Sequence, residues 1–237
     1  MTLPIRSAAL AAITLLAIAP AAAAEKRFGL TSFEAIDVNA DYAIEVTTRA
    51  PVGAVATGPQ DALDRLTIDA RDGRLVIGQR EFAGDADRRA PRGAVTIRIN
   101  AANLRSVTMG GAGSLQIDRL KGTRVTIGLR GPGTMSVGAI TTDRLSVVMI
   151  GNGTMTLSGT AKQAQMTVSG AGLFDAGALA VDMLTFDGEG AGDHVLRAVK
   201  TAAVAARGVG KTVVLGKPVC TVRNVGNGSV QCGTAKR

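Results

Sequence analysis

Seven pairs of glycines, each pair separated by a single residue, recur through the second half of this 237-residue chain. They are Gly111/Gly113, Gly131/Gly133, Gly151/Gly153, Gly170/Gly172, Gly190/Gly192, Gly208/Gly210 and Gly226/Gly228. Successive first glycines lie 20, 20, 19, 20, 18 and 18 residues apart. A nearly fixed period of about twenty residues indicates a repeat architecture in which each unit packs on the next.

Apolar residues occupy the same places in successive units. Four residues before the first glycine lie Val107, Ile127, Val147, Met166, Phe186, Val204 and Val222. Four residues after it lie Leu115, Met135, Met155, Phe174, His194, Thr212 and Val230, and six residues after it lie Ile117, Val137, Leu157, Ala176, Leu196, Val214 and Cys232. Polar residues mostly separate these positions, and alternation with period two indicates strands that bury one face.

These patterns predict an all-β fold, a single-domain parallel β-solenoid with Gly-x-Gly corners. Each coil would contain a strand, a glycine corner, a second strand and a return turn, because glycine adopts the positive φ of a tight corner without strain. Coils would stack about 4.8 Å apart, and the crossover rule for parallel strands predicts right-handed winding. A third short face is expected where Leu120, Ile140, Leu179 and Val199 recur nine residues after the first glycine.

The solenoid domain is expected to span residues 25–237, with regular coils over 101–237 and irregular coils over 25–100. Within the irregular part, Ile36–Val46 and Leu66–Ile77 each show an apolar run, a polar turn and a second apolar run. We interpret both as degenerate coils, since terminal repeats are commonly atypical. A separate small β domain is the alternative.

Residues 81–93 are charged and contain Gly84, Pro91 and Gly93, which predicts a loop. Loops on rigid scaffolds often carry function, so Arg88, Arg89 and Arg92 are candidate binding residues. A solvated insertion between two coils is the alternative reading.

The first 24 residues have the features of a secretory signal peptide. Arg6 precedes an apolar run from Ala8 to Ala19, and Ala22–Ala24 supply a small-residue cleavage site. A membrane anchor is the alternative, but the run is short for one. The mature chain is therefore expected to have no membrane span and to be exported to the periplasm, the cell surface or the medium. Its net charge changes from +8 to +7, because Arg6 is the only charge removed.

Cys220 and Cys232 are the only cysteines, and an exported chain with two cysteines favours one disulfide between them. Facing sheets lie about 10 Å apart, whereas a disulfide needs Cα atoms within about 7 Å. The bond therefore requires the last coil to taper. Two free thiols are the alternative.

Three features could suggest a catalytic, nucleotide or metal site, and none is expected to form one. The segment AARGVGKT at 205–212 loosely matches a phosphate-binding loop, yet Gly208 and Gly210 belong to the corner series and an apolar run follows instead of a helix. His194 is the only histidine and occupies a core column, so neither a zinc site nor a catalytic triad is expected. Glu189 and Asp193 flank one corner, but no calcium-binding pattern repeats. No cofactor is predicted.

Composition limits the choice of partners. Aromatic residues make up 3% of the chain, which leaves few surfaces for stacking bases or sugars and argues against nucleic-acid binding. The basic surplus favours an anionic glycan or another anionic component of the cell envelope. The oligomeric state does not follow from these patterns.

The chain resembles the bacterial family called putative auto-transporter adhesin, head GIN domain. The resemblance rests on Phe33-x-x-Ile36-x-Val38, Tyr42-x-Ile44-x-Val46, Leu66 through Asp72-Gly73 to Leu75-x-Ile77, Val95-x-Ile97-x-Ile99 with Leu104, and the Gly-x-Gly coils. It implies an exported β-solenoid with an adhesin-like role and provides no catalytic residues.

We therefore expect an exported, non-enzymatic β-solenoid that acts as an adhesin-like binding module or an envelope scaffold. An enzyme acting on polysaccharides is the alternative, since solenoids host lyases. A purely structural partner-binding protein is the third reading.

Overall fold

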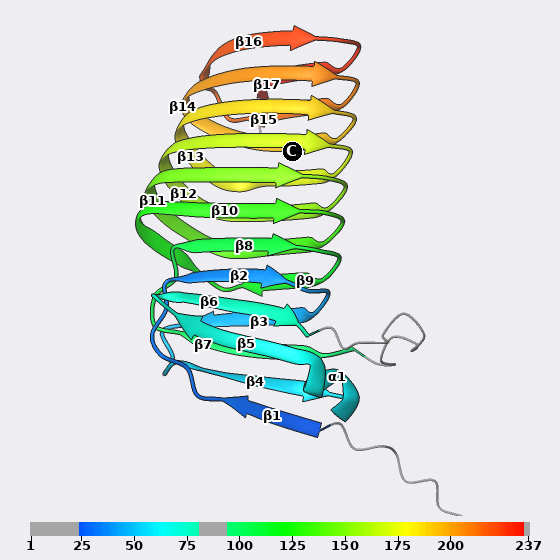
Figure 1. Cartoon of the computed structure of the whole chain (residues 1–237). Helices are drawn as coiled ribbons and strands as arrows, with labels where there is room; N and C mark the ends of the chain where they lie inside the picture. The colour runs from blue at the N-terminus through cyan, green and yellow to red at the C-terminus, as the bar shows by residue number, and fades with distance from the viewer. Residues whose placement is uncertain (1–23, 81–93, 235–237) are drawn as a thin grey trace, which may run out of the picture.

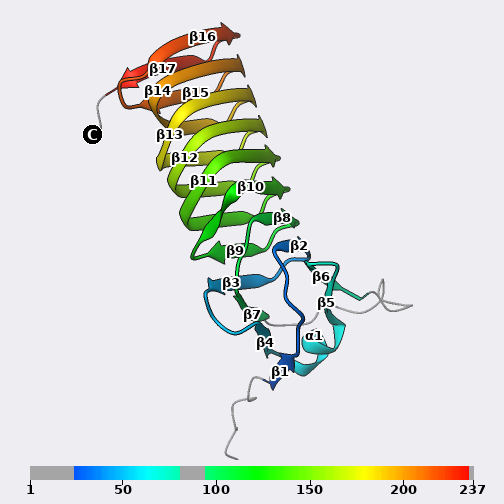
Figure 2. The same ribbon diagram turned by 90° about the vertical axis from the view of Figure 1, so that its left-hand side faces the viewer.

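The computed structural model describes residues 24–80 and 94–234, and these form the predicted β-solenoid, with about six turns. The coil is flattened, with a front and a back face joined by glycine corners on one side and by a smooth bend on the other (Figure 1). Followed from the N-terminal end upward in Figures 1 and 2, the chain winds in a right-handed sense.

The regular coils begin with three strands and continue with four long ones. Strands β8 (Ser106–Gly110), β9 (Ser114–Ile117) and β10 (Leu120–Arg130) lead into β11 (Thr134–Ile150), β12 (Thr154–Gly170), β13 (Leu173–Gly190) and β14 (Asp193–Gly208). Each long strand runs from one glycine corner around the bend to the next. Strands β15 (Lys211–Leu215), β16 (Val219–Val225) and β17 (Ser229–Thr234) complete the array. All neighbouring pairs here are parallel, as in the register Ile127↔Val147↔Met166.

The first glycine of each corner pair has the predicted backbone conformation. Its φ lies between 101° and 130° in all seven corners, a region that residues with a Cβ avoid. These glycines are Gly111, Gly131, Gly151, Gly170, Gly190, Gly208 and Gly226. The first position is thus fixed by backbone conformation.

The second glycine of each pair is required for a different reason. Positive φ values do not occur at Gly113, Gly133, Gly153, Gly172, Gly192, Gly210 and Gly228. The reason for glycine here is space, because a Cβ on any of them would lie within 2.0–2.8 Å of a carbonyl oxygen of the neighbouring coil. The second position is therefore fixed by the close stacking of corners.

The apolar columns fill the interior between the two faces, and Phe174 and Phe186 stack there with ring centroids 6.4 Å apart. Two residues depart from the expected pattern. Val222 is 44% exposed because it lies in the last coil, whose outer side is open in the described residues. Val199 is 51% exposed because the 18-residue coil shifts register at the bend, where Ala198 pairs with Val181 and takes the buried place.

The N-terminal coils stack in a different order from the sequence. Strands β2 (Ala35–Asn39) and β3 (Ala43–Thr48) pair in parallel with β8 and β9. On their other side they pair in parallel with β6 (Arg74–Gln79) and β7 (Thr96–Ala101). The coil formed by residues 35–48 is therefore inserted between two coils that follow it in the chain.

The interpretation of Leu66–Ile77 as a degenerate coil is wrong. Strand β5 (Leu66–Arg71) pairs antiparallel with β6, so this segment is a hairpin. Its turn is Asp72-Gly73, with φ values of 50° and 73°. An Asp-Gly pair with two positive φ angles is a preferred two-residue hairpin turn, because its twist matches that of the flanking strands.

Further antiparallel elements cover the N-terminal end of the solenoid. Strand β1 (Ala24–Phe28) pairs with β4 (Gly53–Gly58), which in turn pairs with β7. The short helix α1 (Gln60–Arg65), which the sequence did not predict, buries Ala62 and Leu63 beside them (Figure 2). In the described part of the chain, no helix has the length and apolar character needed to span a membrane.

Candidate binding surface

Five consecutive coils present a column of polar side chains at the bend. Its members are Thr123, Asp143, Lys162, Asp182 and Lys200. Residues beside each member pair in register with residues of the next coil, for example Thr142 with Ala161 and Arg144 with Gln163. The members therefore follow one another along the solenoid axis. We call this set the bend column. Its charges alternate from Asp143 onward.

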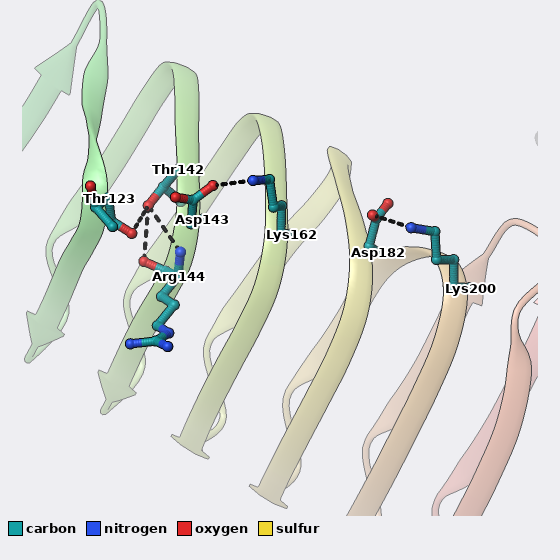
Figure 3. A network of polar contacts seen from close by, with 7 residues as sticks. All are labelled: Thr123, Thr142, Asp143, Arg144, Lys162, Asp182 and Lys200. Atoms are coloured by element: carbon teal, nitrogen blue, oxygen red, sulfur yellow. Dashed lines mark hydrogen bonds and ion pairs between the residues drawn. The ribbon is translucent and has the colours of Figure 1, made fainter.

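Ion pairs link the bend column (Figure 3). Lys162 Nζ lies 2.7 Å from Asp143 Oδ1, and Lys200 Nζ lies 2.6 Å from Asp182 Oδ2. The hydrogen bond to Asp143, and secondly its charge, raise the pKa of Lys162. Such exposed pairs contribute little to the stability of a fold, because water screens the two charges. Their main effect here is to hold the two carboxylates of the column, those of Asp143 and Asp182, against lysines of the next coil.

A buried hydroxyl fixes the backbone beside this column. Thr142 is 7% exposed, and its Oγ1 accepts a hydrogen bond from the Arg144 amide at 3.2 Å. The same oxygen lies 3.2 Å from the Thr123 carbonyl and 3.0 Å from the Arg144 carbonyl, to either of which it can donate. The hydroxyl therefore joins two neighbouring coils at the point where the chain turns onto the front face.

A shallow hollow of about 580 Å³ lies over the bend. Threonines and alternating charges line it, including Thr141, Thr160, Asp143 and Lys162. Rigid strands hold these groups at regular spacing, so the surface suits a ligand that itself carries repeated polar groups.

The bend column was missed by the sequence analysis, although a signal for it exists. Each member lies eight residues before the next corner glycine, for example Asp143 before Gly151 and Lys162 before Gly170. The columns above were aligned by counting forward from the preceding corner glycine. The coils differ in length between that glycine and the bend, so this alignment does not bring the five residues together. Counting backward from the following corner glycine does.

The two cysteines are joined. Cys220 in β16 and Cys232 in β17 form a disulfide with their Cα atoms 6.4 Å apart, so the last coil is narrow at this point. The bond links the front and back strands of the terminal coil. It belongs to the scaffold, and Cys220 pairs in register with Ala202, two residues after Lys200 of the bend column.

His194 lies in the core, 5% exposed, with its ring centroid 5.2 Å from that of Phe186. Burial is the main cause that lowers its pKa, opposed by the nearby Asp193. Its Nδ1 is buried without a hydrogen-bond partner. A neutral imidazole enclosed in this way is not accessible to a substrate in solution.

Three further candidates from the sequence remain: the phosphate-loop-like segment, a metal site and the arginines of the predicted loop. The phosphate-loop-like segment contributes the end of β14, the corner Gly208–Gly210 and the start of β15, so its lysine opens a strand. No group of three or more metal-ligating side chains occurs among residues 24–80 and 94–234. Arg88, Arg89 and Arg92 lie outside the described residues, and their binding role stays a prediction.

Solved structures of bacterial proteins share this fold. A putative adhesin from Bacteroides fragilis NCTC 9343 is 22% identical, with a TM-score of 0.74 over 90% of this chain and 97% of its own. A putative lipid binding protein from Parabacteroides distasonis ATCC 8503 is 18% identical, with a TM-score of 0.69 over 92% and 98%. A putative adhesin from Parabacteroides merdae ATCC 43184 is 17% identical, with a TM-score of 0.70 over 92% and 97%.

The search of curated proteins found no significant match. The profile of one family, by contrast, matches residues 32–218, which includes the inserted coil, the hairpin and the glycine corners through β15. This match confirms the resemblance inferred from the apolar and glycine motifs. The chain belongs to the family described as putative auto-transporter adhesin, head GIN domain.

Proposed function

We propose that this protein is an exported, non-enzymatic binding module that attaches to a component of the bacterial cell envelope or to an extracellular glycan. The observation that carries the proposal is the bend column, in which five coils hold polar side chains in line on a rigid scaffold. Successive side chains of the bend column are about one strand separation apart, a regular spacing that suits a polymer with repeated polar groups.

Two further observations support this function. The family and two of the similar structures carry the description of adhesins, and another similar structure that of a lipid binding protein. In this chain, His194 is buried against Phe186 and is held neutral, so it is poorly placed for acid–base catalysis. A binding role for the exposed strand faces needs no such group.

Attachment can be tested with the purified mature protein and isolated cell-envelope fragments, by co-sedimentation, together with a glycan array. We expect saturable binding to envelope fragments or to a restricted set of glycans. A parallel assay would measure the release of reducing ends from the bound polysaccharides. Absence of saturable binding would exclude the proposal, and catalytic turnover would favour the polysaccharide-acting enzyme instead.

A further inference from the structure

Two arginines face each other on neighbouring coils where the chain leaves the bend. Arg124 in β10 and Arg144 in β11 are partners in the strand register, so their Cα atoms lie about one strand spacing apart, near 4.8 Å. Like charges directly opposite each other destabilise a sheet. Among the described residues, neither guanidinium has an acidic partner within hydrogen-bonding distance.

Elsewhere, basic side chains on neighbouring strands are neutralised by ion pairs. Arg98 pairs with Glu45, Arg207 with Asp187 and Lys162 with Asp143. Arg71 and Arg74 also lie opposite each other, but each is ion-paired, with Asp69 and Asp37 respectively. Asp143 precedes Arg144 directly, but its carboxylate is occupied by Lys162, and the guanidinium of Arg144 points away from it (Figure 3). Arg124 and Arg144 therefore present unneutralised positive charge at one place.

Both arginines line a surface hollow of about 450 Å³. The hydroxyl-bearing Ser106 and Thr126, which are partners in register, line it beside Arg124. Gly122 also lines the hollow, and the atom nearest to a Cβ at this position would be the Arg124 carbonyl oxygen, at 3.3 Å. Arg105 completes the wall and is ion-paired with Glu34.

We propose that this hollow binds a carboxylate or sulfate group of an acidic polysaccharide, with Arg124 and Arg144 as the anion-binding residues. The inference rests on the proposed binding function and names its ligand class and site. A guanidinium offers a planar pair of donors that matches the oxygens of a carboxylate or sulfate. Two of them, one strand spacing apart, can hold one oxyanion between them or contact successive sugar units, while the hydroxyls of Ser106 and Thr126 hydrogen-bond to the sugar.

The lining favours a polysaccharide over an anionic membrane surface. Every side chain that lines the hollow is an arginine, a serine or a threonine, apart from the glycine. Proteins that lie on a membrane combine basic residues with an apolar face that enters the acyl boundary. A recessed polar hollow instead offers hydrogen bonds to a hydroxylated ligand.

The test measures binding of the mature protein to polygalacturonate, to dextran sulfate and to neutral dextran. Arg124→Ala/Arg144→Ala is compared with Arg130→Ala/Arg223→Ala, which removes the same charge from two other exposed arginines. We expect the first variant to lose about tenfold or more in affinity for an acidic polymer, and the control to lose less than about threefold. Neutral dextran should not bind. Both pairs are exposed, so thermal melting should show folded protein in each case.

Equal losses in the two variants would overturn the site, because binding would then follow net charge alone. Failure of the wild-type protein to bind either acidic polymer would also overturn it, as would tighter, arginine-dependent binding to phosphatidylglycerol vesicles. Envelope co-sedimentation separates the two proposals. If both wild type and Arg124→Ala/Arg144→Ala sediment equally with envelope fragments, the binding function stands and this site is wrong.

Discussion

At the residue scale, the corner glycines experience two constraints that are independent of each other. At Gly170 both apply, since its φ is 130° and a Cβ would lie 2.2 Å from the Gly151 carbonyl oxygen. At Gly172 only the second applies, with a Cβ 2.4 Å from the Gly153 carbonyl oxygen. Gly53 provides the contrast, because a Cβ there meets nothing within 4 Å and its φ is ordinary.

Gly170→Ala should therefore destabilise the protein strongly. The backbone conformation alone costs about 1–3 kcal/mol for a residue with a Cβ, and the contact with the coil below adds to this. Gly53→Ala should change the free energy of unfolding by less than about 1 kcal/mol. Urea unfolding of both variants measures the difference, and equal stabilities would show that the corners are not stacked as described.

His194 gives the fold a dependence on pH. Because burial lowers its pKa in the folded state, the unfolded chain binds a proton below its ordinary value of 6.5 while the folded chain resists it. The stability is thus fully present above pH 6.5 and is lost progressively as the pH falls below that value. Asp193 opposes the shift without cancelling it.

His194→Met should remove this dependence. Leu, Met and Phe occupy the same column in four other coils, and the substitution also eliminates the buried Nδ1 that lacks a partner. An unsatisfied buried polar atom costs about 1–3 kcal/mol, so the variant should melt at a higher temperature. Melting curves between pH 7.5 and pH 5 would refute this account if both proteins lost stability in parallel.

At the element scale, the terminal coil is the least supported part of the regular array. In the described residues, β16 pairs only with β14 and β17 only with β15, and Val219 is 75% exposed. The disulfide between Cys220 and Cys232 joins these two strands across a separation of 12 residues. Closing a loop of this size stabilises a fold by about 3 kcal/mol in the chain-entropy description.

Cys220→Ser/Cys232→Ser should loosen that coil selectively. Amide hydrogen exchange should accelerate in Val219–Val225 and Ser229–Thr234, while β11 and β12 keep their protection, because each of these lies between two neighbouring coils. Mass spectrometry of exchanged peptides measures both regions in one experiment. Uniform acceleration along the solenoid would indicate that the disulfide holds the whole array together.

At the scale of the whole molecule, the two ends of the solenoid are built differently. Antiparallel strands and α1 cover the N-terminal end, which protects the backbone groups of an otherwise open edge. The hollow lined by Asp143 and the hollow lined by Arg124 and Arg144 lie along the coils between the two ends. The antiparallel strands and α1 can therefore stabilise the N-terminal end of the solenoid without covering these surfaces.

The predicted signal peptide leads to a specific expectation for the strands at the N-terminal end. Removal of residues 1–24 would leave Glu25–Phe28 of β1 paired with 54–57 of β4, so the mature protein should retain the covered end. Intact-mass measurement on protein secreted by a bacterial host should give a chain that begins at Glu25. A mass that includes the first 24 residues would contradict the signal-peptide prediction.

Much of this architecture could be read from the sequence, because the repeat places equivalent residues at equivalent points of every coil. The spacing of Gly111 and Gly131 predicts a corner, and the columns of Ile127 and Val147 predict its buried neighbours, through local conformation and period-two alternation alone. The hairpin at Asp72-Gly73 was wrongly predicted as a coil, although its turn residues are those of a two-residue hairpin turn and could have indicated it. These features depend on a few adjacent residues, which is why a single sequence can specify them.

Other features were decided only by the tertiary structure. The second corner glycines, such as Gly133, are required by the carbonyl of the neighbouring coil and not by their own φ. Residues 35–48 could stack on either of two later coils, and they pair with both, on opposite sides. Asp143 could have neutralised Arg144, its neighbour in sequence, but it pairs with Lys162 of the next coil, which leaves Arg144 facing Arg124.

In all three cases the outcome depends on the register between segments far apart in the chain, which local conformation does not specify. Local sequence thus determined the coil and its corners. Long-range pairing determined how closely the corners stack, the order of the first coils and the charges that the surface presents.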